Sequence, residues 1–219
     1  MSKSRDEIAA AYDSSPWWYD LRGFFILTFA YNSTLWHQLA FFGPHFGMEH
    51  MEVACGTGTL LEMTLWWRRW KGLPKRHIVG VDYAEPMLAG ARKRFAGKPN
   101  IELRYADAAQ LPYPDATFDT INIANALHCF PDVNSALKDI FRVLKPEGTL
   151  ATNVLLYPRG VWPFKPIAER IDQWGIRKGI LYTPYEHDKI RQHIVKAGFE
   201  IVSECISGNC LDVICRKPA

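Results

Sequence analysis

The chain lacks the features that would place it across a membrane or outside the cell. No uninterrupted apolar run reaches ~18 residues, the length that a membrane-spanning helix needs. The segment 1–13, MSKSRDEIAAAYD, mixes both charge signs and has no apolar region of the kind found in secretory signals. A length of 219 residues fits one domain of ordinary size. These absences predict a cytoplasmic globular domain.

Neither charge sign nor cysteine is used in excess. The 26 Lys and Arg residues against 23 Asp and Glu leave a net charge of +3, which indicates no particular partner. Five cysteines, an odd number, favour reduced thiols over a disulfide framework. Cys205, Cys210 and Cys215 are evenly spaced, but no Cys-x-x-Cys pair occurs, so buried thiols are favoured over a metal or arsenical site. No metal ion is therefore expected.

Two aromatic-rich segments stand out. Residues 23–48 contain no Asp, Glu, Lys or Arg, and predict one or two helices that end at the Gly43-Pro44 pair. Three interpretations of them remain open: ordinary core, a cap over an apolar substrate, or an anchor that gives weak membrane association. The second segment, WWRRWKGLPKR at 66–76, is interpreted as a helix end with a solvated basic face, and no nucleic-acid partner is expected.

From residue 51 onward, short β-rich runs alternate with helical ones. The expected strands are 51–55, 77–83, 101–106, 118–125 and 148–156. The expected helices are 59–70, 86–95, 132–144 and 186–197. Such alternation indicates right-handed βαβ units and an open, mostly parallel α/β sheet. Residues 198–206 and 210–217 flank the turn SGN and predict a hairpin, so the last strand should run antiparallel.

Glycines and acidic residues follow the first three expected strands. Gly56 and Gly58 lie in the turn after the first strand, where a ligand could approach bare backbone N–H groups. Asp82 ends the second strand, as an acidic residue must if it is to accept from both hydroxyls of a ribose. Asp107 follows the third strand and could accept from an exocyclic amine. Because ligands bind at the carboxyl ends of parallel strands, these residues predict one shared site.

In combination, these motifs resemble the class I S-adenosylmethionine (SAM)-dependent methyltransferases over roughly residues 50–155. The matching segments are EVACGTG, VGVDYAEPML, DAAQLPYPDATFD and LKDIFRVLKPEGTL. Within that family the chain looks most like the small-molecule group that includes the ubiquinone and menaquinone C-methyltransferases, whose N-terminal helix carries a pattern like Tyr12-Asp13 and Tyr19-Asp20 here.

The resemblance implies an architecture for the whole chain. It implies a Rossmann-like, seven-stranded, mostly parallel sheet in the order 3-2-1-4-5-7-6, with helices on both faces and strand 7 antiparallel. Residues 1–219 would form a single methyltransferase domain. Within it, residues 1–48 would be an aromatic-rich helical cap and residues 49–219 the SAM-binding core.

The resemblance also implies which residues meet the methionine part of SAM. Glu52 would organise the loop and reach the ammonium of the cofactor through water. Gly56 and Gly58 would admit the methionine moiety, and Asn125 would face it from the end of the fourth strand. Ala54 stands where the family usually has the first glycine of this loop, and should still admit the cofactor.

A second group is implied for the adenosine part. Asp82 would hold the ribose, while Tyr83 and Met87 would pack around the adenine. Asp107 would accept from the adenine amino group, and the backbone of Ala108 would contact the adenine ring.

The expected reaction is transfer of the SAM methyl group to a small apolar or aromatic molecule. A nucleophile held about 3 Å away suffices unless it is protonated at neutral pH, when a general base is also needed. His128, just after the fourth strand, is the candidate base, although a lone His is often structural. The family's base methyltransferases carry Asn-Pro-Pro-Tyr where this chain has Asn-Ala-Leu-His, which disfavours methylation of nucleic-acid bases.

Two other functions remain open on the sequence. One is a SAM-binding protein of the same fold with non-methylating chemistry. The other is a membrane-peripheral methyltransferase anchored by residues 23–48.

Overall fold

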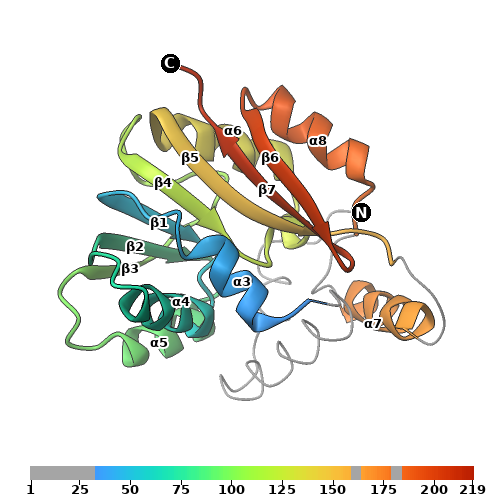
Figure 1. Ribbon diagram of the computed structural model, residues 1–219, viewed down its shortest axis with the longest axis horizontal. Helices are drawn as coiled ribbons and strands as arrows, with labels where there is room; N and C mark the ends of the chain where they lie inside the picture. The colour runs from blue at the N-terminus through green and yellow to red at the C-terminus, as the bar shows by residue number, and fades with distance from the viewer. Residues whose placement is uncertain (1–32, 159–163, 179–183) are drawn as a thin grey trace.

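A computed structural model of the protein describes residues 33–158, 164–178 and 184–219 (Figure 1). One seven-stranded sheet runs through it in the order β3-β2-β1-β4-β5-β7-β6. The strands are β1 (Glu49–Val53), β2 (His77–Asp82), β3 (Ile101–Tyr105), β4 (Phe118–Ile123), β5 (Leu144–Leu155), β6 (Glu200–Ser207) and β7 (Cys210–Arg216). Neighbours among β1 to β5 pair in parallel, and β7 is antiparallel to both β5 and β6. The expected sheet order and the antiparallel last strand are confirmed.

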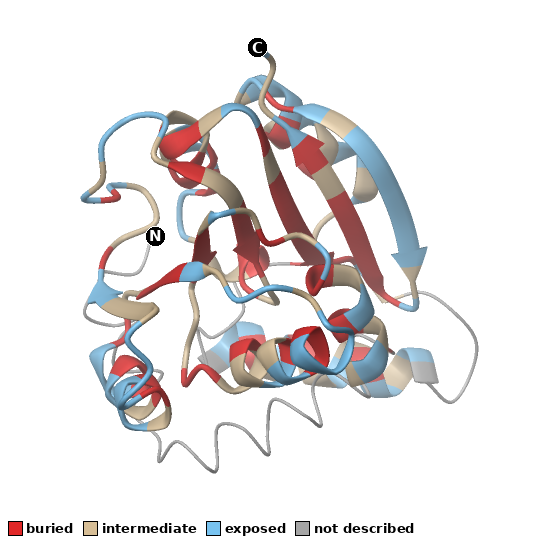
Figure 2. Cartoon of the chain, turned by 60° about the vertical axis from the view of Figure 1, so that its left-hand side comes forward, coloured by how far each residue is buried: buried red, intermediate tan, exposed pale blue. Residues whose placement is uncertain are grey.

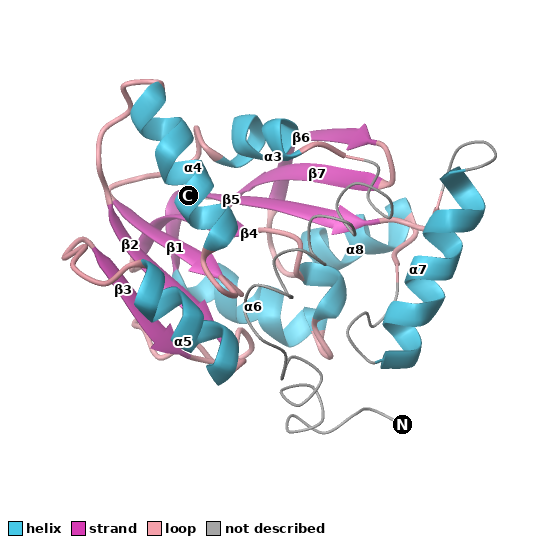
Figure 3. Cartoon of the chain, turned by 90° about the horizontal axis from the view of Figure 1, so that it is seen from below, coloured by secondary structure: helices cyan, strands magenta, loops and turns pink. Residues whose placement is uncertain are grey.

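Helices cover both faces of this sheet (Figure 3). The described helices are α3 (Leu35–Phe42), α4 (Thr59–Trp70), α5 (Glu85–Arg94), the short 3-10 helix η1 (Leu127–Cys129), α6 (Val133–Val143), α7 (Phe164–Lys178) and α8 (His187–Lys196). Along β2, Val79 and Val81 belong to the core beneath α6 and α8, whereas Ile78 belongs to the core beneath α4 and α5. Successive residues of a strand face opposite sides, so this division shows that the sheet is buried between two helical layers.

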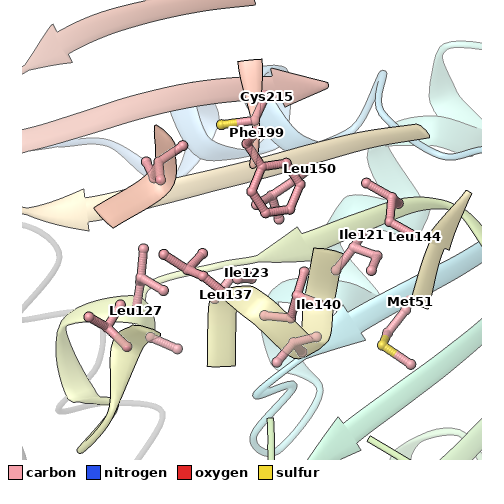
Figure 4. Packing of buried hydrophobic residues seen from close by; sticks show 14 of the residues in the cluster. Met51, Ile121, Ile123, Leu127, Leu137, Ile140, Leu144, Leu150, Phe199 and Cys215 are labelled. Atoms are coloured by element: carbon pink, nitrogen blue, oxygen red, sulfur yellow. The ribbon is translucent and has the colours of Figure 1, made fainter. Parts of the chain in front are cut away.

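The larger core lies between the sheet and α6 and α8 (Figure 4). Leu137 and Ile140 of α6 and Ile194 of α8 are fully buried there, together with Ile121 and Ile123 of β4. Strand β6, at the edge of the sheet next to β7, is exposed along most of its length (Figure 2). The central strands are therefore the most buried part of the fold, and their carboxyl ends position the loops discussed below.

Helix α3 agrees with the expectation for the second half of the aromatic segment. It begins after Thr34, whose Oγ1 accepts from the backbone N–H of His37 at 3.1 Å. At its other end, just before Pro44, the N–H of Gly43 donates to the carbonyl of Leu39. The rest of the expected cap, residues 1–32, lies outside the described residues. In the described part of the chain no helix is long and apolar enough to span a bilayer.

Helix α7 was not expected from the sequence. Ile167, Ile171 and Trp174 recur at helical spacing and mark the helix in the sequence, whereas its described buried positions hold Ala168, Asp172 and Gly175, which are small or charged. A second difference concerns β5, which begins at Leu144 and not at residue 148.

All five cysteines are free thiols, as expected. Within the described ranges, no cluster of His, Cys, Asp or Glu side chains is arranged to hold a metal ion.

Candidate active site

The loop between β1 and α4 has an unusual backbone. Ala54, Gly56 and Gly58 all take positive φ angles, of 56°, 57° and 75°. A side chain at Gly58 would also strike the ring of Phe95, because a Cβ there would lie 2.5 Å from the ring. Gly58 is therefore required at its position, Gly56 takes the left-handed conformation without strain, and the loop exposes peptide groups that side chains would otherwise cover. Ala54 takes the same left-handed conformation without being glycine, at a cost of roughly 1–2 kcal/mol.

Asp82 joins this loop to the end of β2. Its Oδ2 accepts from the N–H of Gly56 and its Oδ1 from the N–H of Ala84, both at 2.7 Å. Burial raises the pKa of Asp82, and the hydrogen bonds from these two amides oppose that rise. A carboxylate has about four lone-pair sites, so Asp82 can hold the loop and still accept from ribose hydroxyls.

Glu52 is buried beside the same loop and is held by its neighbours. Its Oε1 accepts from Nδ2 of Asn122 at 3.0 Å and lies 3.1 Å from Nε2 of His50. The other ring nitrogen, Nδ1, lies 2.7 Å from the hydroxyl of Thr120, which also accepts from the N–H of Gly47. Because an ionised carboxylate can only accept, a neutral His50 carries its proton on Nε2, which points at Glu52, and the Thr120 hydroxyl donates to Nδ1. Both described bonds reach Oε1, which leaves Oε2 for a ligand cation.

Burial lowers the pKa of His50, with the nearby Glu52 acting in the opposite direction. The neutral imidazole therefore acts as a fixed hydrogen-bond donor to Glu52. No pattern in the sequence pointed to His50, although it stands two residues before Glu52 and so on the same face of β1.

Asn125 lies in a network of amides. Its Oδ1 accepts from Gln38 at 2.7 Å and from Asn153 at 2.9 Å, while its Nδ2 donates to Gln38 at 2.9 Å. The backbone N–H of Asn125 also donates to Asn153 at 2.6 Å. The network ties α3 to the carboxyl ends of β4 and β5.

A second contact of α3 lies close to this network. Nε2 of His37 is 2.6 Å from Oδ2 of Asp212, a buried residue of β7 whose register partner on β5 is Asn153. Burial raises the pKa of Asp212, and the contact with His37 lowers it. The signal that the sequence offers for His37 and Gln38 is that they are polar residues inside the charge-free, aromatic-rich segment 23–48.

The residues expected around adenine follow β2 and β3, which are neighbours in the sheet. The ring of Tyr83 packs against that of Tyr105 with centroids 5.4 Å apart. Oδ1 of Asp107 accepts from the N–H of Ala109 at 2.9 Å, and Ala108 packs against the main core. Met87 is only 1% exposed, so a ring could touch it only after neighbouring side chains move. These adenine contacts remain predictions.

His128 lies in η1 and is 4% exposed. Burial lowers its pKa to about 3, and its Nδ1 faces the N–H of Leu155 at 3.4 Å. An imidazole with so low a pKa stays neutral near pH 7 but is a weak base. The structure therefore favours a structural role for His128 over the role of general base.

Comparisons with known proteins agree with this geometry. Residues 51–152 match the family described as "Methyltransferase domain". A demethylmenaquinone methyltransferase of Thermus thermophilus is 39% identical over 110 residues, which make up 49% of this chain and 46% of the relative. The chain thus spans less than half the length of this curated relative.

Solved structures share the fold over more of the chain. A methyltransferase in complex with the Trm112 methyltransferase activator from Haloferax volcanii superposes with a TM-score of 0.71 at 20% identity, covering 99% of this chain and 100% of that one. The [4+2]-cyclase SpnF superposes with a TM-score of 0.65 at 19% identity, covering 84% and 80%. At such identities the similarity shows the fold alone. The family match identifies residues 51–152 as part of a class I, SAM-dependent methyltransferase domain, and the fold around them is the one that these solved structures share.

Proposed function

We propose that the protein transfers the methyl group of SAM to a small apolar or aromatic molecule. The observation that carries this proposal is the hydrogen bond of 2.7 Å from Gly56 to Asp82. It brings a left-handed glycine loop and an acidic residue to one point at the carboxyl edge of the sheet, where such folds bind ligands.

The residues at this edge fit the different parts of SAM. Gly56 and Gly58 leave the backbone bare for the methionine portion, and Oε2 of Glu52 is available for its ammonium group. Asp82 retains lone pairs for the ribose hydroxyls. When bound, SAM supplies a methyl group that its sulfonium already activates, so the protein has to position the acceptor and exclude water.

A ring hydroxyl or other weakly acidic group on the acceptor would also require a proton acceptor. His37 suits this role better than His128, because its side chain is 37% exposed and Asp212 holds its Nε2. If Asp212 is ionised it can only accept, so the proton of neutral His37 is on Nε2 and the lone pair of Nδ1 is free to take a proton. The name of the Thermus thermophilus relative adds support for a quinol-like acceptor.

The proposal is tested in two steps with the full chain. Calorimetry with SAM and with its demethylated product measures cofactor binding. The proposal is refuted if the protein binds neither of them. Incubation with SAM carrying a labelled methyl group, against quinols, phenols, thiols and amines of small size, then measures transfer. Label in a quinol or phenol product is the expected result.

A second function is favoured by one comparison. The fold is shared with a protein described as a [4+2]-cyclase, so a chain of this fold can carry chemistry other than methylation. Tight SAM binding without label transfer to any acceptor of the panel would support a non-methylating enzyme.

A further inference from the structure

Four large apolar side chains form one exposed surface on α3 and α4, which we call the tryptophan surface. It consists of Trp36 of α3 and Met63, Trp66 and Trp70 of α4. The last three share one face of the helix, at positions i, i+3 and i+7. Trp36 and Trp70 join the two helices through an edge-to-face contact with ring centroids 5.6 Å apart. The exposed fractions are 52%, 36%, 59% and 58%, which is high because tryptophan is usually mostly buried.

Buried contacts beneath this surface hold it in place. Trp67 is buried and packs so closely on α3 that a Cβ at Gly43 would lie 2.4 Å from its ring. Arg68 is also buried, and it donates to the carbonyls of Gly43 and Pro74. The sequence-based expectation of a fully solvated basic face is therefore wrong for Arg68. These contacts fix the end of α4, so the exposed rings of Trp66 and Trp70 are carried by a helix that packs against α3.

The charge beside the tryptophan surface has one sign. Arg69, Lys71 and Lys75 are exposed, and residues 63–76 contain no Asp or Glu. The ammonium of Lys71 lies 4.6 Å from the centre of the Trp70 ring, so the positive charge and the exposed aromatic group occupy the same place. Glu62, one residue before this segment, is already engaged by Arg94 at 2.6 Å.

We propose that the tryptophan surface docks the protein onto an anionic lipid bilayer. Tryptophan rings favour the boundary between headgroups and acyl chains, and adjacent Lys and Arg side chains are attracted to anionic headgroups. Exposed apolar groups of this size in a folded domain indicate an interaction site. The surface is formed by α3 and α4, so it extends beyond the segment 23–48 that the sequence suggested as an anchor. The proposal stands independently of the identity of the methyl acceptor.

Sedimentation of the full chain with vesicles tests this. Vesicles of phosphatidylcholine mixed with phosphatidylglycerol should bind the protein, and vesicles of phosphatidylcholine alone should bind it about tenfold less, because the headgroup attraction is lost. The double variant Trp66→Gln, Trp70→Gln should lower binding to the mixed vesicles by about tenfold or more, because it removes the apolar contact. Arg69→Gln with Lys71→Gln should reduce it by a smaller factor and weaken the preference for anionic lipid, because Lys75 remains.

Matched controls come from exposed residues elsewhere. Val202, which is 58% exposed on β6, is changed to Gln, and Lys138, exposed on α6, is changed to Gln. Neither should alter vesicle binding, and thermal unfolding confirms that every variant is folded. The proposal is overturned if the wild type does not bind anionic vesicles, or if the double tryptophan variant binds them with the same affinity as the wild type. It is equally overturned if light scattering shows a dimer that the tryptophan variant dissociates, because the surface would then bind a second copy.

Discussion

Nε2 of His37 lies 2.6 Å from Oδ2 of Asp212, which joins the helix before the first strand to the last strand of the sheet. If His37 takes a proton from the acceptor, His37→Gln should lower kcat by about 10²-fold or more while leaving SAM affinity nearly unchanged. Asp212→Asn should lower kcat less, because the imidazole would remain in place but lose its orienting charge. Initial rates with saturating SAM measure both effects.

The matched comparison is His128→Gln in the same assay. A variant at this buried imidazole should lose stability but keep its turnover when folded. Full activity of His37→Gln together with a large loss in His128→Gln would restore His128 as the base. Full activity in both would leave positioning and water exclusion as the whole mechanism.

Asp82→Ala should weaken SAM binding by ~2 kcal/mol or more, because two ribose hydroxyls lose a charged partner. The bonds to the amides of Gly56 and Ala84 are lost as well, so the melting temperature should also fall. Calorimetry on the folded variant measures the first effect. Asp188→Ala, a change at an exposed residue of α8, is the control, and equal affinities in the two variants would contradict the role of Asp82.

Ala54→Gly should leave the protein as stable as the wild type or more stable by up to ~1 kcal/mol. The substitution relieves a left-handed alanine but increases the conformational entropy of the unfolded chain. Ala89→Gly, in the exposed face of α5, is the matched control and should destabilise by ~1 kcal/mol. Urea unfolding measures both. Equal destabilisation by the two variants would show that Ala54 carries no strain.

Asp172 should make the protein less stable as the pH rises. Its Oδ2 is buried with no hydrogen-bond partner, and burial, with the nearby Glu169, raises its pKa from 3.8 to about 7. Between these values the folded state keeps a proton that the unfolded state has released, so the free energy of unfolding falls as pH rises. Asp172→Asn should therefore gain stability relative to wild type from pH 4 to pH 7, by at most about 4 kcal/mol.

His128 has the opposite effect on acid stability. Its pKa is about 3 in the folded protein against 6.5 in the unfolded chain, so the unfolded state binds more protons in that interval. The free energy of unfolding should fall by up to about 1.4 kcal/mol for each pH unit below 6.5. In the wild type the two residues offset each other between pH 4 and 6.5, and only the Asp172→Asn variant should show the full acid sensitivity. Denaturant unfolding at several pH values measures this.

The sequence predicted the strands and the cofactor loop because their signals are local. An apolar run followed by Gly56 and Gly58 indicates a strand and a turn without knowledge of the rest of the chain. Helix α7 was missed although Ile167, Ile171 and Trp174 recur at helical spacing, because Pro166 and Gly175, residues that usually interrupt helices, stand inside it. Trp66 and Trp67 are adjacent and chemically identical, yet one is exposed and the other buried. Only the docking of α3 on α4 distinguishes them.

Site residues that depend on distant partners were equally hidden. His50 contacts Glu52 directly and is held by the hydroxyl of Thr120 on β4, and Gln38 bonds to Asn125, 87 positions later in the chain. The sequence correctly placed His128 after the fourth strand. It could not show that the ring is buried in the core.

The contacts of α3 also constrain the order in which the chain can fold. Gln38 bonds to a residue 87 positions later, and His37 to one 175 positions later. Contacts of such sequence separation require long loops to close first. During synthesis α3 is made before any strand of the sheet, but its partner on β7 is made near the end. We therefore expect α3 to dock last, so a nascent chain that still lacks β7 would keep Trp36 and its neighbours available to chaperones.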